Sequence, residues 1–115
     1  MEPLAIVTGG ASGIGAAVVS LLAERGWRPL ALDIAAGAAG AAGTEGAAGA
    51  GLRWPVPVDV SDEEAVETAV AAIEAEHGPV AGLVNAAGVL GKMHPPQRLR
   101  MRDWDREMAV DLRGT

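Results

Sequence analysis

A glycine-rich stretch near the N-terminus has the composition of a phosphate-binding turn. The sequence Thr-Gly-Gly-Ala-Ser-Gly-Ile-Gly of residues 8–15 directly follows the apolar run of residues 4–7. Glycine permits a positive φ in a tight turn, lets a pyrophosphate approach the backbone, and lets a helix pack closely on a strand. The unpaired N–H groups at the start of that helix, together with its dipole, favour an anion. Residues 8–15 are therefore predicted to bind phosphate.

An acidic residue at the end of the next apolar run, Asp33, extends this prediction to a dinucleotide. A carboxylate at this position accepts hydrogen bonds from both hydroxyls of an adenosine ribose, and its charge repels a 2′-phosphate. No arginine or lysine lies close by: the turn contains Gly10 and Ala11, and Asp33 is followed by Ile34 and Ala35. The sequence therefore favours NAD over NADP.

Two other classes of nucleotide-binding protein share parts of this pattern. A P-loop needs a lysine followed by serine or threonine after its glycines, whereas Gly15 is followed by two alanines. A Rossmann-type methyltransferase shares the glycine turn and the acid after the second strand, so it stays open as an alternative without redox chemistry. It leaves the sequence Asn85 to Gly88 unexplained.

The elements that must position these residues alternate between strand and helix. Short apolar runs bounded by turn residues are typical of buried parallel strands. Pro55 and Pro57 remove two backbone donors from one side of the third run, which places that strand at a sheet edge. The expected strands are residues 4–7, 30–32, 54–58 and 80–84. Alternation with helices predicts the first half of a Rossmann-type doubly wound α/β fold, a parallel sheet with strand order 3-2-1-4.

Three helices are expected from start and stop signals. The first ends at Gly26 and carries an apolar stripe along one face. That stripe consists of Ile14, Val18, Leu21, Leu22 and Arg25. The second begins with a capping box between Ser61 and Glu64 and ends at Gly78. The third begins near Arg102 and continues to the last residues of the sequence.

Composition argues against several kinds of partner. The 115 residues carry a net charge of −6, which disfavours nucleic acid, and they contain no cysteine. Residues 4–23 are uncharged and long enough to cross a bilayer, but Glu2 stands where a signal peptide needs a basic residue and the glycines would break a helix. We expect no membrane segment and a cytoplasmic protein. No metal site is expected, since His77 and His94 lack partners at a suitable spacing.

Further motifs follow the third and fourth strands. The first motif consists of Thr8 and the glycines at 9, 13 and 15. Along the sequence it is followed by Asp59-Val60 and then by Asn85-Ala86-Ala87-Gly88. Over nearly its whole length the chain resembles the short-chain dehydrogenase/reductase family. The resemblance implies hydride transfer between NAD(H) and a small alcohol or ketone, in a homo-oligomer, dimer or tetramer. Residues 1–115 would be an NAD-binding Rossmann half-domain, truncated before the catalytic segment.

The resemblance also assigns roles to residues of the cofactor site. The pyrophosphate would be bound by Gly9, Ser12, Gly13, Ile14 and Gly15. The adenine ring would meet Asp59 and Val60, although Asp59 also fits a simple turn acid at a strand end. The cofactor ribose and the central sheet would be supported by Asn85, Ala86, Ala87 and Gly88.

The catalytic groups that the resemblance implies are a tyrosine acid/base, a lysine four residues later and a serine, all beyond the last helix of this sequence. The chain contains no tyrosine, so these 115 residues alone are predicted to be inactive. Asp111 stands where the family has an asparagine of the proton relay; it keeps an acceptor but loses the amide donor, and it also fits an ordinary surface acid. A non-catalytic nucleotide-binding module therefore remains the alternative function.

Overall fold

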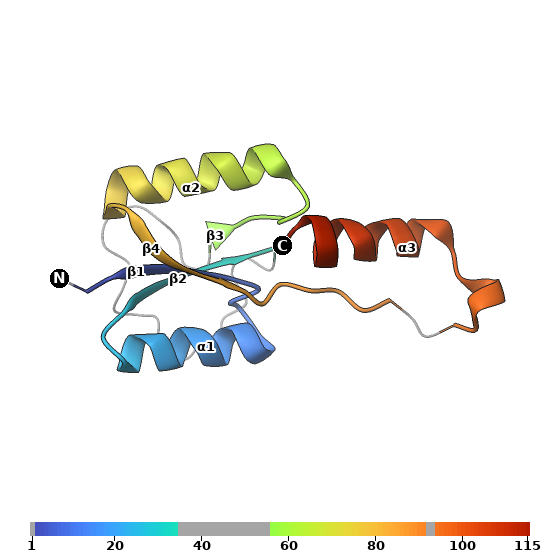
Figure 1. The fold of residues 1–115 in the computed structure, drawn as a ribbon, viewed down its shortest axis with the longest axis horizontal. Coiled ribbons are helices and arrows are strands. Elements are labelled where there is room, and N and C mark those ends of the chain that lie inside the picture. The colour runs from blue at the N-terminus through green and yellow to red at the C-terminus, as the bar shows by residue number, and fades with distance from the viewer. Residues whose placement is uncertain (1, 35–55, 92–93) are drawn as a thin grey trace.

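A four-stranded parallel sheet forms the centre of the molecule. The computed structural model describes residues 2–34, 56–91 and 94–115. The strands pair in the order β3-β2-β1-β4 (Figure 1). Their bounds are β1 Leu4–Thr8, β2 Arg28–Asp33, β3 Val56–Pro57 and β4 Val80–Asn85. Both the predicted Rossmann-type half and its strand order are confirmed.

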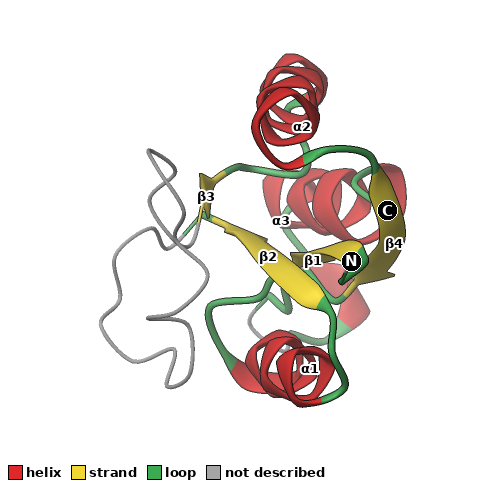
Figure 2. Ribbon diagram, turned by 90° about the vertical axis from the view of Figure 1, so that its left-hand side faces the viewer, coloured by secondary structure: helices red, strands yellow, loops and turns green. Residues whose placement is uncertain are grey.

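Helices cover both faces of this sheet. Helix α1 (Gly13–Glu24) lies on one face and α2 (Glu63–His77) on the other (Figure 2). A short 3-10 turn (Pro96–Arg98) leads into α3 (Met101–Glu107), which projects beyond the carboxyl ends of the strands (Figure 1). Helix α3 continues as a π-helix (Met108–Arg113), in which the Gly114 N–H donates to the Ala109 carbonyl at 2.8 Å. A π-turn of this kind often marks a functional site.

The core consists of apolar side chains on the two faces of the sheet. Towards α2 it contains Leu4, Ile6, Leu30, Leu32, Val56, Val58 and Ile73. Towards α1 it contains Val7, Val19 and Ala31. Because β1 and the middle of β2 are buried on both faces, they read as continuous apolar runs in the sequence.

The predicted apolar stripe of α1 is only partly correct. Val18 and Leu22 pack against the core, but Ile14 is 80% exposed and Leu21 is 50% exposed. The sheet-facing residues of α1 include Gly15 and Val19, both buried. A Cβ on Gly15 would collide with the Gly9 carbonyl oxygen, so the helix makes its closest approach there. That approach fixes the rotation of α1 and turns Ile14 outwards.

Strand β3 lies at the edge of the sheet, as the prolines predicted. Its partner is β2, with Val56 opposite Leu32, and the Val58 N–H donates to the Asp33 carbonyl at 3.2 Å. Trp54 and Pro55, the first residues of the predicted strand, lie outside the described residues. This pairing places the end of β3, and hence Asp59, beside the end of β2.

The start of α2 differs from the predicted capping box. Asp62 is the N-cap residue, and its side chain accepts a hydrogen bond from the Ala65 N–H at 3.1 Å. The Ser61 hydroxyl instead donates to Asp59 Oδ1 at 2.6 Å. A carboxylate is an equally good cap, and its charge also interacts favourably with the helix dipole.

Asp62→Ala should lower the free energy of unfolding by about 1 kcal/mol, because it leaves an N–H of the first turn of α2 without its acceptor. Ser61→Ala is the matched control, since it removes a neighbouring hydroxyl that does not cap the helix. Urea unfolding of both variants measures the difference. Equal losses in the two variants would contradict the assignment of Asp62 as the cap.

Candidate functional site

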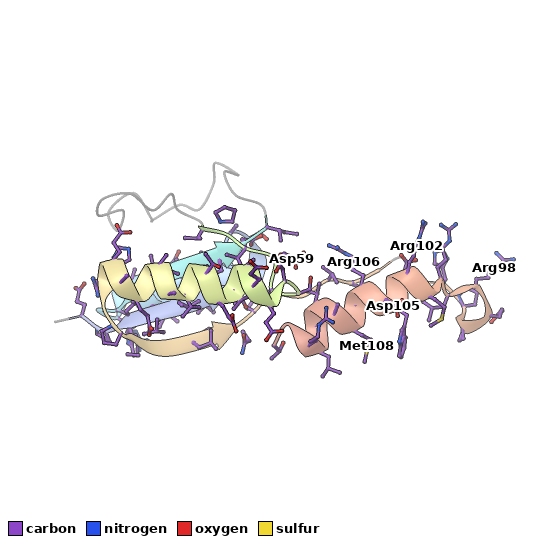
Figure 3. The ribbon with its side chains drawn as sticks, turned by 90° about the horizontal axis from the view of Figure 1, so that it is seen from above. Asp59, Arg98, Arg102, Asp105, Arg106 and Met108 are labelled. Atoms are coloured by element: carbon purple, nitrogen blue, oxygen red, sulfur yellow. The ribbon has the colours of Figure 1, made fainter. Side chains whose placement is uncertain are left out.

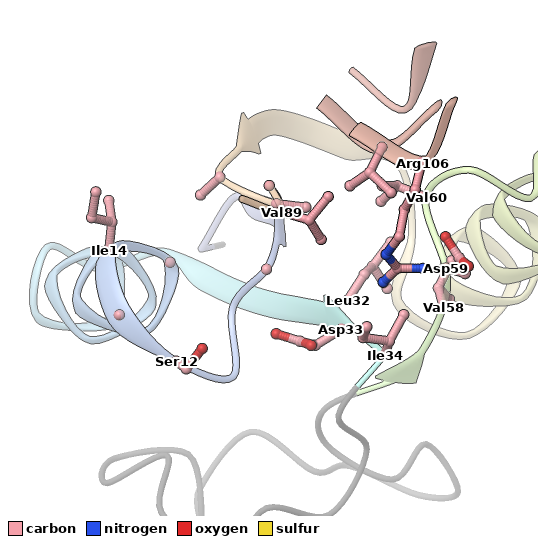
Figure 4. Close-up of a pocket in the computed structure, with 17 residues that line it drawn as sticks. Ser12, Ile14, Leu32, Asp33, Ile34, Val58, Asp59, Val60, Val89 and Arg106 are labelled. Carbon is pink, nitrogen blue, oxygen red and sulfur yellow. The ribbon is translucent and has the colours of Figure 1, made fainter. Parts of the chain in front are cut away.

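A pocket of about 300 Å³ opens at the carboxyl ends of the strands (Figure 4). The glycine turn, the ends of β2 and β4, the segment after β3 and the last helix all contribute to it. It is lined by Gly9, Ser12, Gly13, Ile14, Gly15, Leu32, Asp33, Ile34, Val58, Asp59, Val60, Ala86, Ala87, Gly88, Val89, Arg106 and Val110. Of the predicted cofactor residues, only Asn85 is missing from this lining. Ligands of open parallel sheets bind at this edge, where the chain reverses its direction of winding.

The glycine turn crosses other backbone at very short range. Gly9 has φ 65°, and a Cβ there would lie 2.8 Å from the Ala87 Cα and 2.9 Å from the Ala86 carbonyl oxygen. Gly13 also has a positive φ, 56°, but a Cβ on it would meet no atom within 4 Å. Gly9 is therefore required for both conformation and space, and Gly13 for conformation.

The first turn of α1 faces the pocket without a protein cap. Ser12 is the N-cap residue in extended conformation (φ −152°), yet no side-chain hydrogen bond caps the helix start among the described residues, and no acid lies in its first turn. The N–H groups of a first helical turn have no partner within the helix. Ile14 is 80% exposed, so its apolar side chain does not cover the helix start. This helix start can receive an anion from outside the protein.

Asp33 supports the glycine turn as well as lining the pocket. Its Oδ2 accepts a hydrogen bond from the Ala11 N–H at 3.0 Å, so the end of β2 is tied to the turn that follows β1. Figure 4 shows the carboxylate at the pocket wall between Ser12 and Ile34. The sequence predicted a role for Asp33 toward ribose and gave no signal of this structural contact.

Hydrogen bonds within the loop after β3 stabilise the charged form of Asp59. The hydroxyl of Ser61 and its backbone N–H both donate to Asp59 Oδ1, at 2.6 and 2.9 Å, and these bonds lower the pKa of the carboxyl group. The positive charge of Arg106 lowers that pKa further. A fixed negative charge therefore faces the end of the pocket remote from α1.

Thr8, at the end of β1, binds the segment that follows β4, a role that sequence reasoning missed. It is 6% exposed, and its Oγ1 accepts hydrogen bonds from the Ala86 and Ala87 N–H groups, at 3.2 Å each. These bonds hold the segment after β4 against Gly9. The available signal was a single hydroxyl at the end of an otherwise apolar run.

The last helix fixes the segment after β4 with two carboxylates. Asp111 Oδ1 accepts from the Val89 N–H at 2.7 Å, and Glu107 Oε1 accepts from the Gly91 N–H at 2.6 Å. Asp111 thus acts as an acceptor toward backbone and does not line the pocket, and its catalytic role stays a prediction. Glu107 was not anticipated.

The described part of the chain holds neither a metal-binding cluster nor a membrane-spanning helix. No cluster of three or more histidine or carboxylate side chains suited to a metal ion occurs there. Within the same residues, no helix is both long enough and apolar enough to cross a membrane.

The sequence of residues 3–115 matches the family described as short chain dehydrogenase. The chain belongs to this family. It is 40% identical to D-threitol dehydrogenase of Mycolicibacterium smegmatis, covering 97% of this chain and 43% of that protein. It is 41% identical to cis-4-hydroxycyclohexanecarboxylate dehydrogenase of Sinomonas cyclohexanicum, covering 98% of this chain and 45% of that protein.

Among solved structures, a 3-ketoacyl-(acyl-carrier-protein) reductase from Brucella melitensis complexed with NADH superposes with a TM-score of 0.84. It is 31% identical, over 97% of this chain and 45% of that one. The chain thus spans less than half the length of these relatives. Family membership and the Rossmann-type fold together make it part of an oxidoreductase family that binds a nicotinamide dinucleotide.

Proposed function

We propose that this chain is the cofactor-binding half of an NAD-linked dehydrogenase that transfers hydride between NAD(H) and a small alcohol or ketone. The observation that carries the proposal is one pocket that joins an uncapped helix start to the Asp33 carboxylate. Pyrophosphate needs the first feature and an adenosine ribose needs the second. The chain's family supports the same assignment.

The described residues fit a dinucleotide in shape as well as in charge. Gly9 and Gly15 leave no room for a Cβ, so the turn lies flat against its neighbours and exposes its backbone to the pocket. We assign pyrophosphate binding to the backbone of residues 12–14 and ribose binding to Asp33. Asp59 and Val60 would contact the adenine ring, and residues 86–88 the nicotinamide side. Asn85 would act through the sheet.

Bound NAD supplies the hydride acceptor, while the protein must orient it and provide a proton path. Thr8 keeps the ends of β1 and β4 together, and Asp111 fixes the backbone beyond them, so the pocket floor is held from both sides. We propose NAD over NADP because the Asp33 charge would repel a 2′-phosphate. The proton-transferring tyrosine of the family has no counterpart in these 115 residues. Action in the cytoplasm and as a homo-oligomer remains a prediction from sequence.

The test uses the protein as its own cell produces it, mixed with NAD and a panel of small alcohols. D-threitol and cis-4-hydroxycyclohexanecarboxylate head the panel, since two relatives are named for acting on them. Absorbance of reduced nicotinamide reports the reaction, and we expect it to rise with at least one alcohol. Binding of NAD without reduction by any alcohol would favour the non-catalytic module. Absence of NAD binding would overturn the proposal.

A further inference from the structure

Arg106 brings a positive charge to the pocket from the last helix. It is the single basic residue among the described residues that line the pocket, where the acids are Asp33 and Asp59. Figure 4 shows its side chain reaching into the pocket toward Asp59. The chain neighbours of the glycine turn and of Asp33 are uncharged, so this cation reaches the site only through folding.

The guanidinium of Arg106 makes no direct polar contact with the residues that the structure describes. Within those residues it forms neither a hydrogen bond nor an ion pair, and its charge acts on Asp59 only through space. An arginine carries five N–H donors on a planar, always charged group. The positive charge of Arg106 lowers the pKa of Asp59, but neither a hydrogen bond nor an ion pair joins these two side chains. The donors and the flat face of Arg106 therefore remain available to a ligand.

The surroundings of Arg106 suit a flat aromatic ring. Val58 and Val110 are almost fully buried, and with Ile34 and Val60 they form an apolar wall at this end of the pocket. Val110 belongs to the same continuous helical segment as Arg106. A ring resting on this wall would have one face on aliphatic side chains and the other open to a guanidinium. Stacking on an aromatic face is a favoured contact of arginine.

We propose that Arg106 stacks its guanidinium on the adenine ring of the bound cofactor and so closes the adenine end of the pocket. This inference rests on the proposed function, because it takes NAD as the ligand of the pocket. It adds a charged binding residue from the last helix to the glycine turn, the start of α1 and the strand ends that form the rest of the site. It also couples cofactor binding to α3, which Glu107 and Asp111 attach to the segment after β4.

A contact with a 2′-phosphate is the main competing role for this cation. Asp33 lies in the same pocket, and its charge opposes a phosphate placed there. The two roles predict different ligands, because stacking acts on every ligand that contains adenine whereas a phosphate contact acts on NADP alone.

The experiment measures dissociation constants by calorimetry for the protein as its cell produces it and for Arg106→Ala, Arg106→Lys and Arg102→Ala. The ligands are NAD, ADP-ribose, NADP and nicotinamide mononucleotide, of which the last lacks adenine. Arg102 is the matched control: it lies on the same helix, its side chain is 74% exposed, and it does not line the pocket (Figure 3).

Arg106→Ala should weaken NAD and ADP-ribose by the same factor, about 3-fold to 30-fold, and leave nicotinamide mononucleotide unchanged. Arg106→Lys should recover only part of this loss, because an ammonium keeps the charge without the planar face. Arg102→Ala should change nothing. Unaltered binding of ADP-ribose by Arg106→Ala, or a loss confined to NADP, would overturn the inference. If the unsubstituted protein binds neither NAD nor ADP-ribose, the proposed function itself has failed.

Discussion

Gly9→Ala is expected to lower the free energy of unfolding by about 2–5 kcal/mol and to abolish NAD binding. The new methyl group would lie 2.8 Å from the Ala87 Cα and 2.9 Å from the Ala86 carbonyl oxygen, and neither backbone atom can move alone. The Thr8 bonds to the Ala86 and Ala87 N–H groups hold that segment in place. Relief of the clash must therefore separate the glycine turn from β4. Urea unfolding and calorimetric titration with NAD measure the two effects.

Gly13→Ala is the matched control for Gly9→Ala. Both glycines have a positive φ, so both substitutions carry the conformational cost of about 1–2 kcal/mol, but only Gly9 faces backbone that a Cβ would strike. The loss of unfolding free energy should therefore be clearly smaller for Gly13→Ala. Equal losses would mean that close packing against residues 86 and 87 contributes nothing, contrary to the geometry.

Replacement of Asp33 by alanine together with Ile34→Arg is expected to reverse the cofactor preference. The double variant loses the carboxylate that would accept from the ribose hydroxyls and gains a cation for a 2′-phosphate. Hydrogen bonds to a charged group contribute about 1.5–3 kcal/mol each, so the ratio of the NADP to the NAD dissociation constant should fall by at least about 100-fold. Titration of each cofactor gives this ratio, and an unchanged ratio would contradict the role of Asp33.

Asp33→Asn is the matched variant that separates charge from structure. Its amide oxygen can still accept from the Ala11 N–H, a bond of 3.0 Å in the native protein, so the glycine turn keeps its support. Removal of the negative charge should ease the exclusion of NADP without adding a cation. We expect a ratio of dissociation constants between those of the native protein and the double variant. A ratio equal to the native one would show that the charge does not select the cofactor.

Local backbone chemistry explains why much of this fold could be predicted from sequence. Glycines at 9 and 13 are needed where φ is positive, and the structure has φ 65° and 56° there. Prolines cannot donate to a neighbouring strand, and β3 is indeed an edge strand. Gly78, with φ 91°, ends α2 as predicted. Each of these signals depends on a few adjacent residues.

The features that the sequence did not predict depend on contacts between segments that are distant along the chain. The periodicity of α1 fits more than one stripe, and the choice between them depends on the close approach of Gly15 to Gly9, which only the folded chain contains. Serine and aspartate are both good N-cap residues. In the folded chain Asp62 caps α2, because the Ser61 hydroxyl is bound to Asp59. Arg106 reaches the pocket from a helix far along the chain. The residues next to Asp33 in the sequence therefore did not reveal that an arginine lines the same pocket.

The measurement that tests the central claim most directly is a crystal structure of the protein as its cell produces it, grown with NAD. The account predicts the pyrophosphate at the backbone N–H groups of residues 12–14, where α1 begins without a cap, and the adenosine ribose hydroxyls on the Asp33 carboxylate. NAD bound elsewhere on the protein, or an adenosine ribose placed away from Asp33, would contradict it.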